Sequence, residues 1–302
     1  MWFWLSLAAL ICWSGSDLFS KLGCQDARDK YSHLKMVMAV GLVMGLHAAY
    51  EVFVGGTVIN LTVMLTYLPV SALYILSMAM GYLGLRYIEL SISSPICNSS
   101  GALVAVLVLA TDGLGSTSPL QLAAVGCVCV GVVALGITEA REDDDLRAAR
   151  QDASNHHYAK SWIAITIPVI YCLLDALGTF ADSRVLMTLN EDSANVAYEL
   201  TFLLVGIGCA IYVLGVKKQK LIVRQETPKY IGAVCETAGQ FAYIYAIADQ
   251  AHVALAAPII SAYCVASVLW SRIFLKEKLS ARHYAAIALV VVGIVILGIF
   301  DV

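Results

Sequence analysis

The sequence predicts an all-α integral membrane protein with ten transmembrane helices, arranged as two inverted five-helix repeats. Three observations lead to this fold class. Of the 302 residues, 60% are hydrophobic and only 14% are charged, whereas about a quarter of an ordinary soluble domain is charged. Ten apolar stretches are each long enough to cross a bilayer core of about 30 Å as a helix. The second five stretches also repeat the layout of the first five.

The predicted spans follow one another with short connections. They cover residues 2–20, 34–54, 62–86, 91–111, 119–138, 161–181, 195–215, 229–248, 252–274 and 283–300. The first span has no basic segment before it, so we interpret it as a membrane helix rather than a cleavable signal peptide. The one long polar stretch, 139–160, is predicted to be a charged cytoplasmic linker. It divides a first repeat at 1–138 from a second repeat at 161–302.

The internal repeat is weak in single residues and consistent in order. A shift of 161–163 positions places the second half on the first, and the matched pairs are Phe19 with Phe180, Tyr82 with Tyr245, Pro95 with Pro258, and Ala123 with Ala286. An odd number of spans in each half turns the second copy over in the membrane. The sequence therefore predicts the inverted repeat that is common among secondary transporters.

Lysine and arginine gather on one side of the predicted topology. The odd-numbered connections and their flanks hold 18 of the 19 basic residues, and only Arg184 lies on the other side. Because cytoplasmic loops carry an excess of basic residues, we expect the odd connections in the cytoplasm and both termini outside. The protein is predicted to be a multi-pass protein of the inner or plasma membrane.

Composition also limits the partners. A net charge of -3 and a pI near 6.0 leave no basic surface for nucleic acid. The nine cysteines are scattered through apolar stretches without a CxxC pair, which favours core packing over a metal site. We therefore expect a small-molecule substrate and the lipid bilayer as partners, and no metal or cofactor. A monomer is expected, with a dimer through the Gly41–Gly45 GxxxG motif as the alternative.

Several local strings resemble one transporter family. From Tyr243 to Gly298 the chain has a Tyr/Ala-rich helix, a short turn, a helix containing Pro258, the string Phe274-Leu275-Lys276-Glu277 and a glycine-rich last span. This stretch resembles the second-repeat ending of the drug/metabolite transporter superfamily, in its ten-span members built from two EamA-type repeats. The opening Trp13-Ser14-Gly15 is similar to the Trp-Gly pattern of the family's first helix, although Ser14 stands where glycine is usual.

The resemblance covers nearly the whole chain and implies the fold more than the substrate. Members of the family carry amino acids, quaternary amines, drugs, nucleotide-sugars or metabolites. Many members are described with cytoplasmic termini, which conflicts with the orientation that the basic residues predict. We keep the orientation given by the basic residues.

Two acids lie inside predicted spans, where an ionisable group is costly and is a functional candidate by default. Asp175 shares a helix face with Tyr171, and Glu236 shares one with Gln240 and Tyr243, because residues four apart are neighbours on a helix. Such a stripe suits a cationic or zwitterionic solute, or a proton exchanged against it. The alternative is a buried, neutral acid that hydrogen-bonds between helices.

Other polar residues in the spans complete the candidate substrate site. They are Asn98, Ser261, Trp13, Tyr74 and Tyr263. Two roles are predicted for Asp17: an ion pair with Lys21 one helical turn away, or a position in the pocket beside Trp13. Helix packing through small and polar residues is the alternative for the hydroxyl-rich start of the fourth span. His47, Glu51 and Glu199 are interpreted as interface-anchoring groups.

These residues favour a secondary active transporter. We expect it to move a small cationic or zwitterionic metabolite, such as an amine, an amino acid or a drug, by alternating access, with Glu236 and Asp175 as the groups for proton coupling if it occurs. A non-transporting membrane receptor is the alternative. An enzyme is not expected, because the GxGD and HExxH motifs of intramembrane proteases and zinc proteases are absent.

Overall fold

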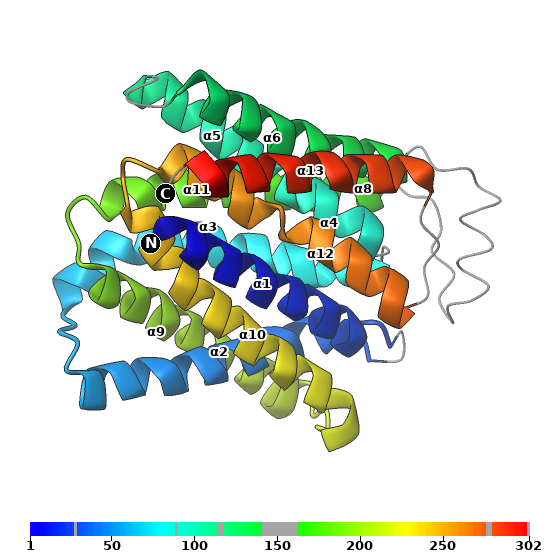
Figure 1. Ribbon diagram of the computed structural model, residues 1–302. Helices are drawn as coiled ribbons and strands as arrows, with labels where there is room; N and C mark the ends of the chain where they lie inside the picture. Colours follow the sequence, from blue (N-terminus) through cyan, green and yellow to red (C-terminus); the bar gives the residue numbers. More distant parts are fainter. Residues whose placement is uncertain (27–28, 88–89, 114–117, 141–161, 276–279, 301–302) are drawn as a thin grey trace.

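The helices run back and forth along one axis. A computed structural model describes residues 1–26, 29–87, 90–113, 118–140, 162–275 and 280–300. Figure 1 shows both chain ends at one end of the bundle, which we call the terminus end. The last helix before residue 141 and the first helix after residue 161 meet at the opposite end, which we call the linker end. No strand occurs among the described residues.

The first half contains the helices up to residue 140. They are α1 (Trp2–Cys24), α2 (Ser32–Tyr50) with the π-helical segment η1 (Glu51–Gly55), α3 (Leu61–Tyr87), α4 (Leu90–Asn98), α5 (Ser100–Asp112) and α6 (Pro119–Ala140). Each predicted span of this half falls within these segments. The predicted linker, 139–160, lies outside the described residues apart from its first two positions.

The second half follows the same plan. It comprises α8 (Trp162–Val185), α9 (Glu191–Ala210) with η2 (Ile211–Val216), α10 (Val223–Ala248), α11 (Val253–Ser261), α12 (Tyr263–Trp270) with η3 (Ser271–Leu275), and α13 (Ala281–Phe300). Three of these helices, α9, α10 and α13, begin earlier than their predicted apolar stretches. Helix α9 begins with polar residues, and the Asn190 side chain caps this start by accepting hydrogen bonds from the backbone N–H groups of Asp192 and Ser193.

Seven described segments are long and apolar enough to cross a membrane. They are Trp2–Cys24, Ser32–Gly55, Leu61–Leu85, Ser93–Asp112, Pro119–Thr138, Glu191–Val216 and Val253–Leu275. A shorter apolar helix spans Ala281–Leu297. The all-helical, multi-span fold class is confirmed, and the count of ten spans stays a prediction.

One span in each half is broken in the middle. The helix that contains Pro95 is interrupted at Ser99, between α4 and α5, and the helix that contains Pro258 is interrupted at Ala262, between α11 and α12. At Ser99 the backbone N–H donates to the Ile96 carbonyl at 3.3 Å, three residues back rather than four. The Ser99 hydroxyl donates to the Pro95 carbonyl at 3.0 Å, which satisfies an acceptor near the break.

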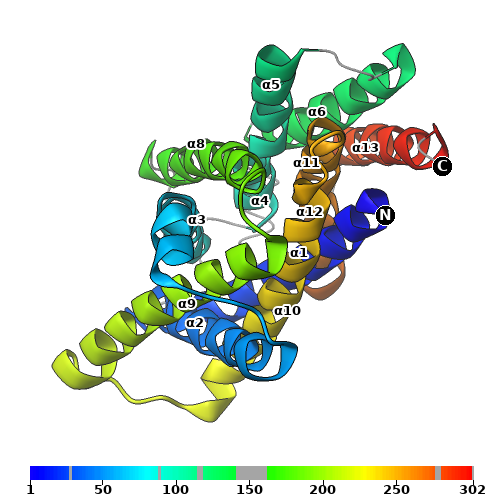
Figure 2. The ribbon, with the colours of Figure 1, turned by 90° about the vertical axis from the view of Figure 1, so that its left-hand side faces the viewer.

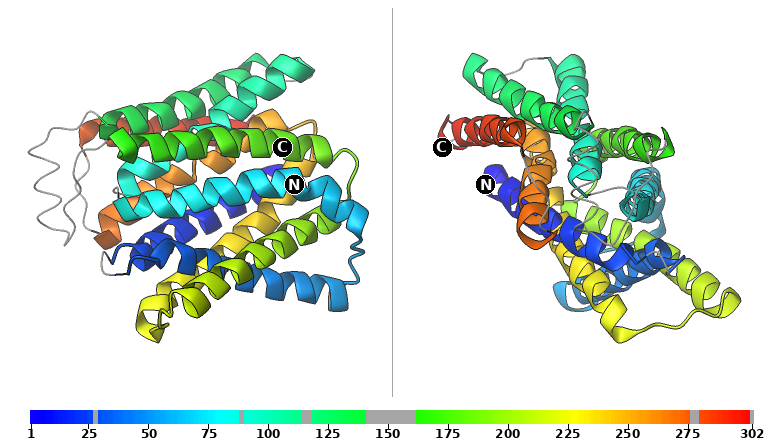
Figure 3. Two further views of the ribbon diagram at one scale, coloured as in Figure 1. Left: turned by 180° about the vertical axis from the view of Figure 1, so that it is seen from behind. Right: turned by 90° about the vertical axis from the view of Figure 1, so that its right-hand side faces the viewer.

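The two halves pack against each other throughout. Helix α1 packs on α10, α8 packs on α3, and the pairs α2 with α9, α5 with α11 and α6 with α13 also cross between the halves. Viewed along the bundle, α2, α9 and α10 lie at one edge and α5, α6 and α13 lie at the opposite edge (Figure 2; Figure 3, right). The core therefore belongs to both halves at once.

Glycine lets helices α2 and α9 approach closely. A Cβ atom at Gly41 would stand 2.7 Å from the Phe202 carbonyl oxygen, and one at Gly45 would stand 2.7 Å from a Leu203 methyl carbon. The GxxxG motif therefore serves packing inside the chain.

Four buried charges join helices α2 and α10 at the linker end. Lys35 Nζ lies 2.9 Å from Asp29 Oδ2 and 3.4 Å from Glu226 Oε1, while Lys229 Nζ lies 2.9 Å from Glu226 Oε2 and 4.0 Å from Asp29 Oδ2. The Lys229 side chain is 1% exposed. We call Asp29, Lys35, Glu226 and Lys229 the four-charge cluster. Their alternating signs compensate one another where water is scarce.

Candidate functional site

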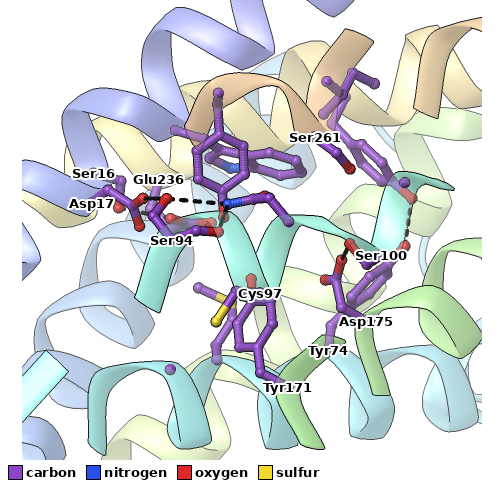
Figure 4. A pocket seen from close by; sticks show the side chains of 18 of the residues that line it. Ser16, Asp17, Tyr74, Ser94, Cys97, Ser100, Tyr171, Asp175, Glu236 and Ser261 are labelled. Atoms are coloured by element: carbon purple, nitrogen blue, oxygen red, sulfur yellow. Dashed lines mark hydrogen bonds between the residues drawn. The ribbon is translucent and has the colours of Figure 1, made fainter. Parts of the chain in front are cut away.

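A cavity with a volume of about 80 Å³ lies between the two halves. Its wall takes residues from α1, α3, α4 and α5 of the first half and from α8, α9, α10, α11 and α12 of the second. A void of this size has room for several water molecules or a small solute. Figure 4 shows the side chains that project into it.

All ten residues predicted for the substrate site line this one cavity. They are Trp13, Tyr74, Asn98, Tyr171, Asp175, Glu236, Gln240, Tyr243, Ser261 and Tyr263. The structure thus brings together side chains from seven helices that are far apart in the sequence. Their part in binding a substrate stays a prediction.

Two of the cavity acids each hold a serine of the facing half. The Ser100 hydroxyl, at the start of α5, donates to Asp175 Oδ2 at 2.7 Å, and the Ser16 hydroxyl of α1 donates to Glu236 Oε2 at 2.7 Å. Both carboxylates are half-buried. Each acid therefore links its own helix to the other half of the chain and lines the cavity.

Asp17 is a third acid in the wall. Its Oδ2 accepts hydrogen bonds from Ser94 at 2.5 Å and from Ser267 at 2.8 Å, while Lys21 Nζ donates to the Leu85 carbonyl at 2.9 Å. Of the two readings given for Asp17, the structure places it in the pocket. The helical face it shares with Trp13 was the signal for this position.

The amide of Asn98 extends the Asp17 network. Its Nδ2 donates to the Ser94 carbonyl at 2.8 Å and lies 3.2 Å from the Ser94 hydroxyl oxygen. Asn98 is the last residue of α4, directly before the helix break. Asn98 therefore bonds within its own turn to the serine that donates to Asp17, and its amide lies at the cavity wall.

Aromatic rings form much of the remaining wall. The Trp13 ring centroid lies 5.1 Å from that of Tyr243 and 5.8 Å from that of Tyr263. The hydroxyl of Tyr74 bonds to Tyr243 and donates to Thr179 at 3.1 Å. Gly178 leaves space for the Tyr74 ring, since a Cβ atom there would come within 2.9 Å of it. These π faces are surfaces on which a cation binds favourably.

Sequence reasoning missed a further buried acid, Asp182. It lies on α8 two turns beyond Asp175, is fully buried, and accepts a hydrogen bond from the Tyr67 hydroxyl at 2.8 Å. It is not part of the cavity wall. The predicted span ended at residue 181, so Asp182 fell in a connection. Its spacing from Asp175 and Thr179 on one helix face was the available signal.

The peripheral acids lie elsewhere. His47 Nδ1 of α2 is 2.8 Å from Glu199 Oε1 of α9, and His47 Nε2 is 3.7 Å from Glu51 Oε1. Glu199 is fully buried between the helices. Glu199 joins α2 to α9, with His47 and Asn195 as its polar partners. The interface-anchoring role of these groups stays a prediction.

Comparison with known proteins gives a family for the second half. Residues 162–299 match the EamA-like transporter family. One solved crystal structure aligns with a TM-score of 0.64, covering 98% of this chain and 96% of that chain at 13% sequence identity. At that identity the likeness shows the fold alone. Among the curated proteins, none matches this chain in sequence. Over its second half the chain is therefore similar to the EamA-like transporter family, and seven of its described segments are long and apolar enough to cross a membrane.

Proposed function

We propose that the protein is a secondary active transporter that moves a small cationic or zwitterionic metabolite, such as an amine, an amino acid or a drug, by alternating access. The observation that carries the proposal is the charge of the cavity wall. Asp17, Asp175 and Glu236 line it, and no lysine or arginine does so among the described residues. A positively charged group beside these carboxylates offsets the cost of removing them from water, whereas an anion adds repulsion in a low dielectric.

The repeat architecture supports alternating access. We propose ten spans in two inverted five-span repeats, at 1–138 and 161–302, with the cavity between them. The interruptions at Ser99 and Ala262 occupy equivalent places, 163 residues apart. Broken helices at a midplane site between inverted repeats are typical of secondary transporters.

A reciprocal contact between helices α6 and α13 supports the same symmetry. A Cβ atom at Gly131 would stand 2.5 Å from Val290 Cγ2 and 3.0 Å from the Ala286 oxygen, and one at Gly293 would stand 2.7 Å from both Val128 Cγ2 and the Ala124 oxygen. Each residue of one contact lies 162 positions from its equivalent in the other. Such an exchange of partners is what a two-fold axis between two repeats produces.

Substitution of these two glycines tests the symmetry. Gly131→Ala and Gly293→Ala are expected to destabilise the protein to a similar extent, by about 1–3 kcal/mol each, because each methyl group overpacks the same kind of contact. Gly126→Ala is the control on α6, since a Cβ atom there meets nothing within 4 Å. The thermal unfolding midpoint in detergent measures the effect. A large loss in one variant and none in the other would contradict the proposed equivalence.

We further propose that the linker end faces the cytoplasm and that both termini lie outside. The cysteine in an Asp144→Cys variant, made in a background without the nine native cysteines, should resist impermeant thiol reagents added to intact cells and react once the membrane is opened. Equal labelling before and after the membrane is opened would contradict the proposed orientation and place the linker end outside.

The test of function is transport by the purified protein in proteoliposomes. A primary amine is expected to move and to bind most tightly, its neutral isostere less tightly, and a carboxylate analogue least. A carboxylate that binds tightest would overturn the assignment of charge. Saturable binding of an amine without any flux would instead favour a membrane receptor. We propose that the functional unit is a monomer, because the GxxxG face of α2 is already covered by α9.

A further inference from the structure

The three cavity acids form two separate groups. Figure 4 shows Asp17 and Glu236 with Ser16 and Ser94 at one side of the cavity, and Asp175 with Ser100 and Ser261 at the other side. The first group comes from α1 and α10, and the second comes from α8. A ligand with a single positive charge can therefore pair directly with only one group at a time.

The spacing of the two groups follows from one broken helix. Asp17 accepts from Ser94 and Asp175 accepts from Ser100, at 2.5 and 2.7 Å. Ser94 lies in α4 and Ser100 begins α5, on opposite sides of the break at Ser99, so the two serines hold the two acid groups apart. One ammonium group can make a charge-assisted contact with each acid group, so two ammonium groups joined by a carbon chain can occupy both. The small cavity favours a short chain.

The wall also contains polar groups that lack a protein partner. The Tyr82 hydroxyl and the Gln240 amide nitrogen are buried, and neither has a hydrogen-bond partner in the described part of the chain. Tyr82 is 6% exposed and Gln240 is 3% exposed. Gln240 lies one helical turn from Glu236. The Tyr82 oxygen can accept a hydrogen bond, so an ammonium group beside the Asp17–Glu236 pair can donate to it. The Gln240 amide nitrogen is a donor and needs an acceptor, such as a water molecule or a polar oxygen of the ligand.

We propose that the preferred substrate is a short α,ω-diamine, with one ammonium group held by Asp175 and the other by Asp17 and Glu236. The inference rests on the proposed transport of cations and adds the number and spacing of the charges. Two cations and one proton neutralise the three carboxylates. The aromatic rings of Trp13 and Tyr263, which face each other edge to face, offer π surfaces to the chain between the charges.

Binding of four probes to the intact chain tests the proposal. The probes are 1,4-diaminobutane, 4-amino-1-butanol, 1-aminobutane and 4-aminobutanoate, which share one carbon chain and differ at one end. The diamine is expected to bind about 10- to 100-fold more tightly than 4-amino-1-butanol, since the second ammonium gains a charge-assisted contact. In Asp175→Asn this ratio should fall to about threefold or less. In the control Asp182→Asn, a buried acid of the same helix outside the cavity wall, it should persist.

A chain-length series on the unmodified protein gives an answer that needs no variant. Affinity among α,ω-diamines of three to six carbons should pass through a maximum, because the two carboxylate groups are at fixed separation. Equal affinity for 1,4-diaminobutane and 4-amino-1-butanol, tightest binding of 4-aminobutanoate, or a preference unchanged in Asp175→Asn would each overturn the diamine inference. If single-charge amines are transported as well as diamines, the transport function stands and this inference fails. If no amine binds or moves, both fail.

Discussion

If Glu236 and Asp175 exchange protons during transport, Glu236→Gln and Asp175→Asn are each expected to abolish accumulation of substrate against its gradient when a pH gradient is the only driving force. The reason is that the amide keeps the shape and the hydrogen-bonding size of the acid and cannot exchange a proton. Each acid holds a serine hydroxyl at 2.7 Å, and an amide oxygen can accept the same bond. The protein should therefore fold, bind less tightly and fail to couple. Uptake into proteoliposomes with an imposed pH gradient measures the effect.

The matched control is Glu51→Gln, the same chemical change in a half-buried acid at the end of α2, away from the cavity wall. It should retain gradient-driven uptake. Exchange of labelled for unlabelled substrate without a pH gradient separates coupling from binding, because exchange needs no net proton movement. Undiminished uphill uptake in both cavity variants would assign Glu236 and Asp175 to helix packing.

Lys229→Ala is expected to cost about 3–5 kcal/mol of stability, because removal of one partner leaves buried charges uncompensated. Lys229 contacts both acids of the four-charge cluster and is 1% exposed. Its aliphatic stem also packs on Gly23, where an added Cβ atom would stand 2.6 Å from Lys229 Cγ. The thermal unfolding midpoint in detergent should fall steeply.

Two further variants separate the charge from the packing. Lys229→Met keeps an unbranched apolar stem and loses the ammonium, so it should remain much less stable than the unmodified protein. Lys220→Ala removes an exposed lysine of the same region and should change stability by less than about 0.5 kcal/mol. A melting curve for Lys229→Met that matches the unmodified protein would show that the buried charges are dispensable.

Apolar length and helical periodicity predicted the helices well and their ends less well. Apolar length predicts a span at 229–248, but α10 begins at Val223. A helix continues beyond the apolar stretch for as long as its backbone groups find hydrogen-bond partners. The proline and hydroxyl groups near Asn98 indicated a loosened helix, and the structure has a break at Ser99. Which residue breaks the helix depends on the packing of α5 against α11, and no local pattern encodes that.

The candidate site was predictable from the residue types that a membrane helix tolerates poorly. Asp175, Glu236 and Asn98 stood out for this reason, and all three line the cavity. Asp17 was ambiguous because periodicity gives the face of a helix and not the neighbour opposite that face. Asp182 was missed because the boundary of an apolar stretch is a poor guide to where burial ends. The burial of Asp182 follows from the packing of α3 beside α8, which brings the Tyr67 hydroxyl to its carboxylate.

The four-charge cluster makes the two ends of the bundle energetically unequal. Two identical inverted repeats would give the inward-open and outward-open forms the same free energy, since each form would be the other turned over. A shift of 162 residues replaces Asp29, Lys35, Glu226 and Lys229 by Glu191, Ala197, Met64 and Tyr67. The counterpart of Lys229 is Tyr67, a neutral donor to Asp182. Under the proposed alternating access, ionic contacts would hold one end shut and a phenol hydrogen bond would hold the other, and we expect the unloaded protein to favour closure of the linker end.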